Sequence, residues 1–258
     1  MIIQYKNIDI HYTDHGKGEA YILIHGFLEN LKMWHPFIED LSKTKRIICV
    51  DLLGHGDTGS LEQVHTMEMM ADAVAVLIKN LNVKSCGLVG HSMGGYVALS
   101  MLERYPEIVN SIFLVNSTAK ADSLEKKENR DRAIAAVKHD AKSFIRISVS
   151  NLFNPENKEK HAEAIKQITE EALKTPQHGI VAALGGMKIR ENRTELLAHF
   201  TGKKWMLISE KDPVFELKSL LDEAEKTKVT RMILPDGHMS FIEQKNKFFE
   251  TLMHFIEK

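Results

Sequence analysis

Ser92 is the residue of this chain best placed to do chemistry. It stands at the centre of the run 90–94, Gly-His-Ser-Met-Gly, which fits the G-x-S-x-G pattern of a nucleophile elbow. The run at 85–89 is typical of a short buried strand, and the run at 96–102 is typical of a helix. A strand-to-helix turn this tight strains its central residue and lifts the side chain clear of the sheet. A Cβ at either flanking glycine would collide with the neighbouring chain, so the pattern predicts a nucleophilic serine.

A serine hydroxyl is a poor nucleophile near neutral pH, so it needs a base and an acid that orients the base. In enzymes with this elbow the chain order is serine, acid, histidine. The strand expected at 204–208 is followed by Asp212, and the strand expected at 229–234 is followed by His238. Both residues fall just past the carboxyl end of a strand, where open parallel sheets carry their chemistry. We predict Asp212 as the acid and His238 as the base.

Other residues compete for these two roles. Glu210 and Asp236 are alternatives for the acid. The sequence holds 13 histidines, but only His238 combines a position after a late strand with a preceding glycine. His91, inside the elbow, is interpreted as a packing residue beside the nucleophile rather than as a second base.

An acyl-transfer site also needs N–H donors for the oxyanion that develops on the substrate. One donor is the backbone N–H after the nucleophile, which is that of Met93. The second comes from the loop after an earlier strand. The buried strand expected at 20–24 runs into His25 and Gly26, so the N–H of Phe27 is predicted as this donor. The alternative is an ordinary strand-to-loop turn.

Together these motifs resemble the α/β-hydrolase superfamily and are most similar to its small bacterial esterase-like members with a helical cap. The resemblance covers nearly the whole chain. It implies a cofactor-free serine hydrolase with Ser92, Asp212 and His238 as the triad and no metal. It also implies that Phe27 and Met93 donate to the oxyanion. The motifs that carry it are His25-Gly26-Phe27, Asp51-Leu52-Leu53-Gly54-His55-Gly56, Gly90-His91-Ser92-Met93-Gly94-Gly95, Asp212-Pro213 and Gly237-His238.

Three positions depart from particular branches of that superfamily. Tyr96 stands where the menaquinone-pathway lyases carry an arginine that holds a substrate carboxylate, and no other arginine is evident beside the elbow. Met239 follows the histidine where carbon–carbon bond hydrolases tend to have a tryptophan. Dehalogenases and epoxide hydrolases use an aspartate nucleophile, which Ser92 excludes. Asp51 and His55 are interpreted as structural residues that shape a turn.

Composition narrows the class of partner. The 258 residues are 43% hydrophobic, enough for a substantial core, and 34 basic residues balance 35 acidic ones. We therefore expect no nucleic-acid or membrane partner, and leave the oligomeric state open. The N-terminus lacks the features of a signal peptide, so a cytoplasmic protein is expected. Cys49 and Cys86 fall in expected strands and are interpreted as inert core thiols rather than as a disulfide or metal ligands.

Alternating strand and helix patterns predict an α/β fold with a doubly wound, mostly parallel sheet. A hairpin is expected at 2–13 with its turn near Lys6-Asn7, a helix at 67–81 and a last helix at 240–257. The α/β-hydrolase core is predicted at 1–118 and 191–258.

Residues 119–190 break the alternation. No convincing strand interrupts this interval, so we interpret it as an inserted helical cap of about four helices over the catalytic edge, with Gly185-Gly186 as a hinge. The alternative is that these helices pack elsewhere on the sheet. A cap makes the pocket concave and excludes water.

The predicted function is hydrolysis of a carboxylic ester, or a related acyl bond, of a small and mostly apolar substrate through an acyl-enzyme. Alternatives are a lyase or carbon–carbon hydrolase that uses the same triad, and a ligand-sensing signalling protein that keeps it. The predicted pocket residues are apolar and are Phe27, Leu28, Phe144, Leu184, Met187, Val214 and Met239.

Overall fold

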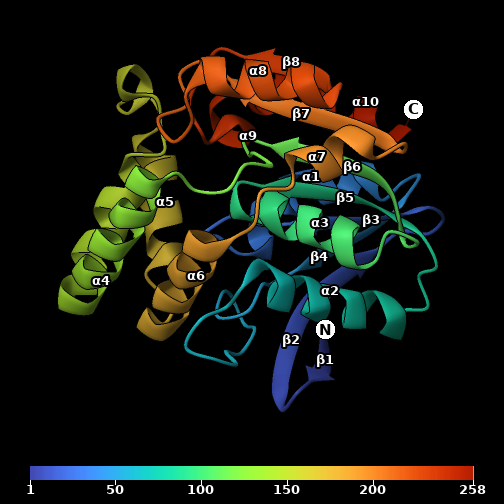
Figure 1. Cartoon of the computed structure of the whole chain (residues 1–258), viewed down its shortest axis with the longest axis horizontal. Coiled ribbons are helices and arrows are strands. Elements are labelled where there is room, and N and C mark those ends of the chain that lie inside the picture. The colour runs from blue at the N-terminus through green and yellow to red at the C-terminus, as the bar shows by residue number, and fades with distance from the viewer. Residues whose placement is uncertain (258) are drawn as a thin grey trace.

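The computed structural model describes residues 1–257, and an eight-stranded sheet forms its centre (Figure 1). The strand order is β1-β2-β4-β3-β5-β6-β7-β8. The strands are β1 Ile2–Tyr5, β2 Ile8–His15, β3 Ala20–Ile24, β4 Arg46–Val50, β5 Cys86–His91, β6 Val109–Val115, β7 Lys203–Ser209 and β8 Thr230–Leu234.

Six neighbouring strands, from β4 to β8, are parallel, and only β1 and β2 join by antiparallel pairing. The prediction of a mostly parallel sheet is therefore confirmed. The central strands are buried along their whole length, as apolar strands covered on both faces must be. Because β5, β6, β7 and β8 are parallel, their carboxyl ends lie along one edge of the sheet.

Helices cover both faces of the sheet, which confirms the doubly wound plan. One hydrophobic cluster packs β3 and β4 against α1 and α10, and the other packs α2, α3 and α8 on the opposite face. The helices are η1 Leu31–Trp34, α1 His35–Leu41, α2 Met67–Asn80, α3 Met93–Arg104, α4 Leu124–Ser150, η2 Pro155–Asn157, α5 Ala162–Ala172, α6 Gln177–Ile189, α7 Thr194–His199, α8 Leu217–Thr227, α9 Ser240–Glu243 and α10 Lys245–Glu257.

Local geometry explains the turn between β1 and β2 and the start of α2. Lys6 and Asn7 both adopt positive φ, 46° and 70°, which is the geometry of a tight hairpin turn between β1 and β2. Thr66 caps α2, since its hydroxyl accepts a hydrogen bond from Met69 N at 3.1 Å. The apolar stripe of α2 then packs into the core, as its helical spacing predicts.

The expected helix at 240–257 is divided in two. Gln244, between α9 and α10, has φ −130° and ψ 45°, which no α-helix accommodates. The short α9 begins two residues after His238, and the break separates it from α10, which packs its apolar side chains into the core. The prediction of one continuous helix is therefore wrong at this residue.

Helices α4, α5 and α6 form the helical insertion, which stands at the left of Figure 1 beside the sheet. All eight strands lie outside residues 119–190. Asp140 has non-helical angles inside α4, so α4 consists of two helical pieces that meet at a kink. Helix α6 packs against α4.

Gly185 and Gly186 lie inside α6 and do not interrupt it. A Cβ added at Gly186 would lie 1.7 Å from the carbonyl oxygen of His65. The glycine therefore permits close packing of α6 on the segment before α2, and the hinge expected at this pair stays a prediction.

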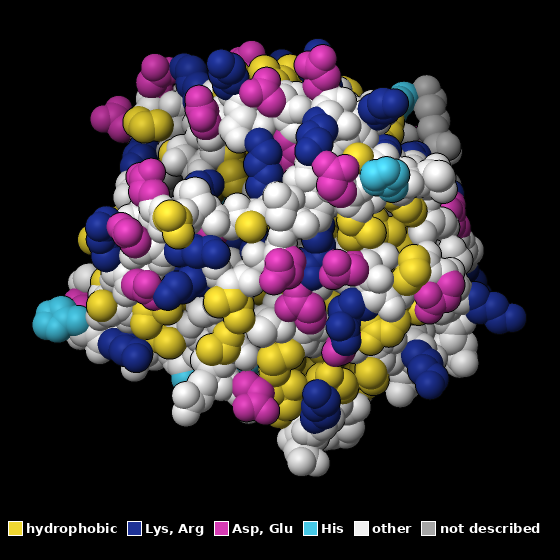
Figure 2. Space-filling view, in the orientation of Figure 1, with side chains coloured by type: hydrophobic (Ala, Val, Ile, Leu, Met, Phe, Trp, Pro, Cys, Tyr) yellow, Lys and Arg dark blue, Asp and Glu magenta, His cyan; other side chains and the backbone are white. Residues whose placement is uncertain are grey.

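The surface and the thiols add little chemistry of their own. Basic and acidic side chains are interspersed over the face seen in Figure 2. Cys49 and Cys86 are buried and free, and burial raises the pKa of each thiol to about 12. Within residues 1–257, no helix combines the length and the apolar composition needed to cross a membrane.

Candidate active site

Ser92 lies in the turn between β5 and α3 and has φ 49° and ψ −115°, a strained conformation for a residue with a side chain. Steric crowding around the turn explains its two glycines. A Cβ at Gly90 would lie 2.4 Å from the carbonyl carbon of Gly94, and a Cβ at Gly94 would lie 2.3 Å from Ile24 O. The turn is held by Ser92 N, which donates to Val115 O at 2.9 Å. The elbow geometry expected from the motif is thus present.

Asp212 and His238 come together at the carboxyl edge, although 26 positions separate them. His238 Nδ1 lies 2.8 Å from Asp212 Oδ2, and both side chains are almost fully buried. The other carboxylate oxygen, Oδ1, accepts from Val214 N at 2.8 Å and from Phe215 N at 3.3 Å. The carboxylate is therefore fixed in position by the loop that follows β7.

The electrostatics of this pair favour an ionised carboxylate. Burial alone would raise the pKa of Asp212, but the facing His238 and the surrounding donors hold that pKa below its usual value. Since the carboxylate can only accept, His238 Nδ1 must be the donor of the bond. The other ring nitrogen, Nε2, then keeps its lone pair in neutral imidazole.

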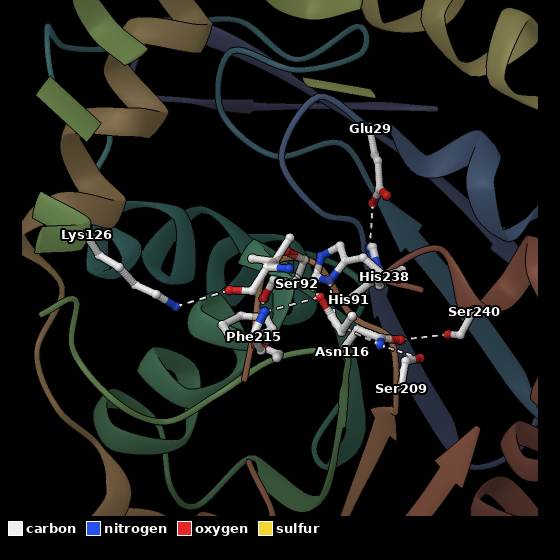
Figure 3. Close-up of polar contacts among 12 residues, drawn as sticks. Glu29, His91, Ser92, Asn116, Lys126, Ser209, Phe215, His238 and Ser240 are labelled. Atoms are coloured by element: carbon white, nitrogen blue, oxygen red, sulfur yellow. Dashed lines mark hydrogen bonds and ion pairs between the residues drawn. The ribbon is translucent and has the colours of Figure 1, made fainter. Parts of the chain in front are cut away.

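Asn116 supports Asp212 and was not among the residues singled out in the sequence. Its Nδ2 donates to Asp212 Oδ2 at 3.1 Å and to Ser209 Oγ at 2.8 Å (Figure 3). Its Oδ1 accepts from Ser240 Oγ at 2.6 Å. A signal existed, because Asn116 is a polar residue directly after the apolar strand β6, at the same sheet edge as the other site residues.

Ser92 and His238 line the same cavity, although within residues 1–257 no hydrogen bond joins Ser92 Oγ to His238. Such bonds are often long without substrate and tighten in the reacting complex. The two backbone donors predicted from the sequence are those of Phe27, which lines the same cavity, and of Met93, which directly follows Ser92. Neither Phe27 N–H nor Met93 N–H donates to an acceptor within residues 1–257, so both remain available to a ligand.

Beside Ser92, a buried pair is formed by Glu29 and His91, which line the same cavity. Glu29 Oε2 accepts from His91 Nδ1 at 2.9 Å and from Gly26 N at 2.5 Å. The other ring nitrogen of His91, Nε2, lies 3.1 Å from the carbonyl oxygen of His238. One side-chain pair therefore joins the loop of Gly26, the nucleophile elbow and the loop of His238.

Both ring nitrogens of His91 face oxygen atoms, Glu29 Oε2 and the carbonyl oxygen of His238, an arrangement that favours the doubly protonated imidazolium. Burial would lower the pKa of His91, but Glu29 reverses the effect and holds it above the usual value. Burial would raise the pKa of Glu29, but His91 and Gly26 N hold it below the usual value. His91 has no free lone pair and cannot act as a base. From the sequence, His91 was interpreted as a packing residue, and no charge was predicted for it.

A cavity of about 280 Å³ opens above Ser92 between the sheet edge and the helical insertion. Residues from both parts of the chain line it, and most are apolar. Of the seven residues predicted for the pocket, six line this cavity: Phe27, Leu28, Phe144, Leu184, Met187 and Val214. The remaining lining residues are Glu29, His91, Ser92, Tyr96, Lys126, Asn129, Arg130, Ala133, Ser148, Leu152, Phe215 and His238.

Met239, the seventh, does not line this cavity. It is fully buried with Phe241 and Phe248 in the cluster on the other face of the sheet. It lines a separate hollow between α1, α5 and α9. Its neighbour His238 occupies the site instead, because the chain crosses from one face to the other at this point.

Cations reach the site from the helical insertion, contrary to the sequence reading that no arginine lies beside the elbow. The guanidinium of Arg190 stacks over the ring of Tyr96, with 4.0 Å between its central carbon and the ring centroid. Lys126 and Arg130, both from α4, line the cavity. Because these residues are 30 or more positions from Tyr96, no local pattern predicted their approach.

The other residues weighed from the sequence lie outside the cavity. Asp51 organises loops, since Oδ1 accepts from Leu31 N at 2.8 Å and Oδ2 lies 2.8 Å from His11 Nδ1. His55 is buried, and burial lowers its pKa to about 3. Glu210 is exposed, while Asp236 accepts from the side-chain amides of neighbouring segments. Neither acid contacts His238 through its side chain.

Comparison with known proteins gives a family match over most of the chain. Residues 21–245 match the model of the alpha/beta hydrolase fold. The structure is similar to that of an esterase from Thermogutta terrifontis, solved with malate bound, with a TM-score of 0.91 and 30% sequence identity. That superposition covers 97% of this chain and 93% of the esterase. An esterase from Exiguobacterium antarcticum shares the fold, with a TM-score of 0.90 over 100% of this chain and 99% of its own, at 22% identity.

Among curated sequences, 115 residues of the chain are 31% identical to (E)-2-((N-methylformamido)methylene)succinate hydrolase from Acinetobacter baylyi. The matched segment is 45% of this chain and 44% of that enzyme, so less than half of each protein is compared.

Proposed function

The chain belongs to the alpha/beta hydrolase fold family, and from that premise we propose that it is a serine hydrolase. Its proposed reaction is cleavage of a carboxylic ester, or a related acyl bond, of a small substrate with a mostly apolar skeleton. Support comes from the buried contact between Asp212 and His238 at the cavity that Ser92 lines. The 30% identity to an esterase of the same fold adds to it.

In the proposed mechanism, Ser92 Oγ attacks the substrate carbonyl while His238 Nε2 accepts its proton. Asp212 holds the Nδ1–H tautomer of His238 and stabilises the imidazolium that forms. The proton then passes to the departing alcohol, which leaves an acyl group on Ser92. A water molecule, activated by His238, releases the acid and restores the serine.

The oxyanion of each tetrahedral intermediate needs donors that are already oriented. In the proposal these are the backbone N–H groups of Phe27 and Met93. The segment with Phe27 is held by Glu29, which accepts from the adjacent Gly26 N. Glu29 is thus a positioning residue for this loop, because it contacts the backbone rather than the substrate.

We further propose that residues 119–190 act as a cap over this site, with residues 1–118 and 191–258 as the catalytic core. Phe144, Leu184 and Met187 of the insertion line the cavity together with core residues. Apolar side chains on that side exclude water from the reacting groups, which strengthens the electrostatic interactions inside.

The decisive test is covalent labelling with a serine-directed fluorophosphonate, followed by peptide mass spectrometry. The label is expected on Ser92 alone, and it should disappear when His238 is replaced by Ala, because the serine then lacks its base. Pre-steady-state hydrolysis of p-nitrophenyl acetate should give a burst followed by many turnovers. Labelling of another serine, or a single turnover without further product, would contradict the proposal.

A further inference from the structure

Three cations approach the cavity from the helical insertion and its carboxyl end, and we refer to them as the insertion cation cluster: Lys126, Arg130 and Arg190. Lys126 and Arg130 are four residues apart in α4, so they lie on the same face of the helix. Both line the cavity that contains Ser92, and Figure 3 shows Lys126 reaching toward the site from the side opposite Glu29.

One carboxylate serves this cluster. Asp122 is fully buried and forms ion pairs with Arg130 Nε at 3.1 Å and with Arg190 at 2.6 Å. Arg190 is itself buried, and its Nε and Nη1 also donate to Lys120 O and Met187 O. Arg130 and Arg190 thus share one carboxylate, which leaves the three cations with an excess of positive charge on this side of the cavity.

The positive charge left without a paired carboxylate is that of Lys126. Within residues 1–257 it forms no ion pair with a carboxylate, and the only acceptor of its ammonium is Val214 O at 3.3 Å. The ammonium also lies 4.7 Å from the centroid of the Phe215 ring. Burial lowers the pKa of Lys126, and the neighbouring guanidinium groups add to the effect. A partly buried ammonium with unused donors is stabilised by an anion that enters the cavity.

We propose that the cavity binds a substrate with a carboxylate beyond its reacting acyl group, and that Lys126 and the free face of the Arg130 guanidinium hold this carboxylate. The inference rests on the proposed hydrolysis and names the class of substrate for the same site. The small volume and the apolar remainder of the lining fit a short carbon chain that separates the carboxylate from the ester.

A carboxylate suits these groups better than a phosphate dianion does. Arg130 already gives Nε to Asp122, so one ammonium and part of one guanidinium remain for the ligand. These donors match the two oxygens of a single carboxylate. The cavity wall around them is formed largely by apolar side chains, which favour a monoanion on a hydrocarbon chain.

The test compares hydrolysis of monomethyl adipate with that of methyl hexanoate, which has the same number of acyl carbons but no charge. The wild-type chain is expected to prefer the anionic ester in kcat/KM. Lys126→Met should lower the ratio of anionic to neutral kcat/KM by a factor of about 10–100, as expected for a lost hydrogen bond between charged groups. Lys126→Arg should retain most of the ratio. Lys127→Met, on the same helix but not lining the cavity, is the matched control and should leave the ratio unchanged.

A binding measurement separates failure of this inference from failure of the proposed hydrolysis. Adipate should raise the melting temperature of the wild-type chain and of Lys127→Met, but not that of Lys126→Met, whereas hexane-1,6-diol should have no such selective effect. If neither ester is hydrolysed while adipate still binds through Lys126, the proposed hydrolysis fails and the anion site stands. If Lys126→Met keeps both the preference and the adipate effect, the anion site is refuted.

Discussion

Two groups of charged residues border the same cavity. They differ in whether each charge is paired with an opposite charge. On the sheet side, Glu29 pairs with His91 and Asp212 pairs with His238, each through one short contact. On the side of the helical insertion, two members of the insertion cation cluster, Arg130 and Arg190, pair with Asp122, while Lys126 pairs with no carboxylate within residues 1–257. Figure 3 shows Glu29 and Lys126 on opposite sides of Ser92.

The difference reflects what each side contributes. The charges on the sheet side are almost fully buried, and a buried charge is stable only with a built-in partner, which also fixes its geometry. Such geometry is what acyl transfer requires of its base and acid. Lys126 on the insertion is only half-buried, so water can solvate it until a ligand replaces that water. In the proposed function, the core therefore supplies the reacting groups and the insertion supplies selectivity.

The largest effect is expected at the centre of the sheet side. Ser92→Ala should lower turnover of methyl butyrate by a factor on the order of 10⁴ or more, because the three reacting side chains act as a unit. Ser100→Ala is the matched control, since Ser100 lies on the adjacent helix α3 and its hydroxyl has no hydrogen-bond partner within residues 1–257. Steady-state kinetics and circular dichroism of both variants provide the measurement. If folded Ser92→Ala kept substantial activity, Ser92 would not be the nucleophile, and the sheet side of the cavity would not supply the reaction.

Asp212→Asn should lower kcat by a factor on the order of 10³–10⁴, because an amide can donate to the histidine and favour the wrong tautomer. Glu210→Gln alters an exposed acid of the same loop and should retain wild-type kinetics. If instead Glu210→Gln lost activity and Asp212→Asn kept it, Glu210 would be the acid. The pair of Asp212 and His238 would then have no role in catalysis.

Glu29→Gln tests whether the second pair on the sheet side needs its charge. The change leaves the His91 imidazolium buried without a counter-charge and is expected to lower the free energy of unfolding by about 3 kcal/mol. It should also loosen the loop of Phe27, so kcat should fall more than KM rises. Glu39→Gln, an exposed position of α1, is the control, and urea unfolding measures both.

The stability difference between wild type and Glu29→Gln should depend on pH. Glu29 has a lowered pKa in the folded chain, so its contribution is present above its ordinary value of 4.5 and is lost as pH falls below it. His91 has a raised pKa, so its contribution is complete below its ordinary value of 6.5 and declines as pH rises above it. The difference should therefore be largest between pH 4.5 and 6.5. A difference that grows above pH 6.5 would contradict an ionic pair.

The smallest effect concerns the apolar wall that the insertion adds. For neutral esters, kcat/KM should rise about fourfold with each acyl methylene from acetyl to hexanoyl, since a buried methylene contributes about 0.8 kcal/mol. It should then fall for longer chains that exceed the cavity of about 280 Å³. A series of p-nitrophenyl esters measures this. A steady rise to palmitoyl would indicate an open groove, and the insertion would not then select substrates by size.

The sequence alone was sufficient for the fold and for the placement of Ser92, Asp212 and His238 at one edge of the sheet. Runs of apolar residues predicted the buried strands, and the glycines around Ser92 predicted a turn that only small residues permit. Asp212 and His238 could be named because each directly follows a strand of a parallel sheet, whose carboxyl ends must share one edge. These features depend on local spacing and on a regular sheet, both of which the order of residues determines.

Only the tertiary structure decided which distant side chains meet. Glu29 lies 62 positions from His91, and Arg190 stacks on Tyr96 from the far end of the insertion. Met239 was assigned to the wrong cavity, because one residue's difference along the chain moves a side chain to the other face of the sheet. Partners of this kind depend on how whole elements pack, and packing is a property of the entire core rather than of any short run of residues. For the same reason, the sequence indicated the reaction, while the charge of the cavity emerged only from the folded chain.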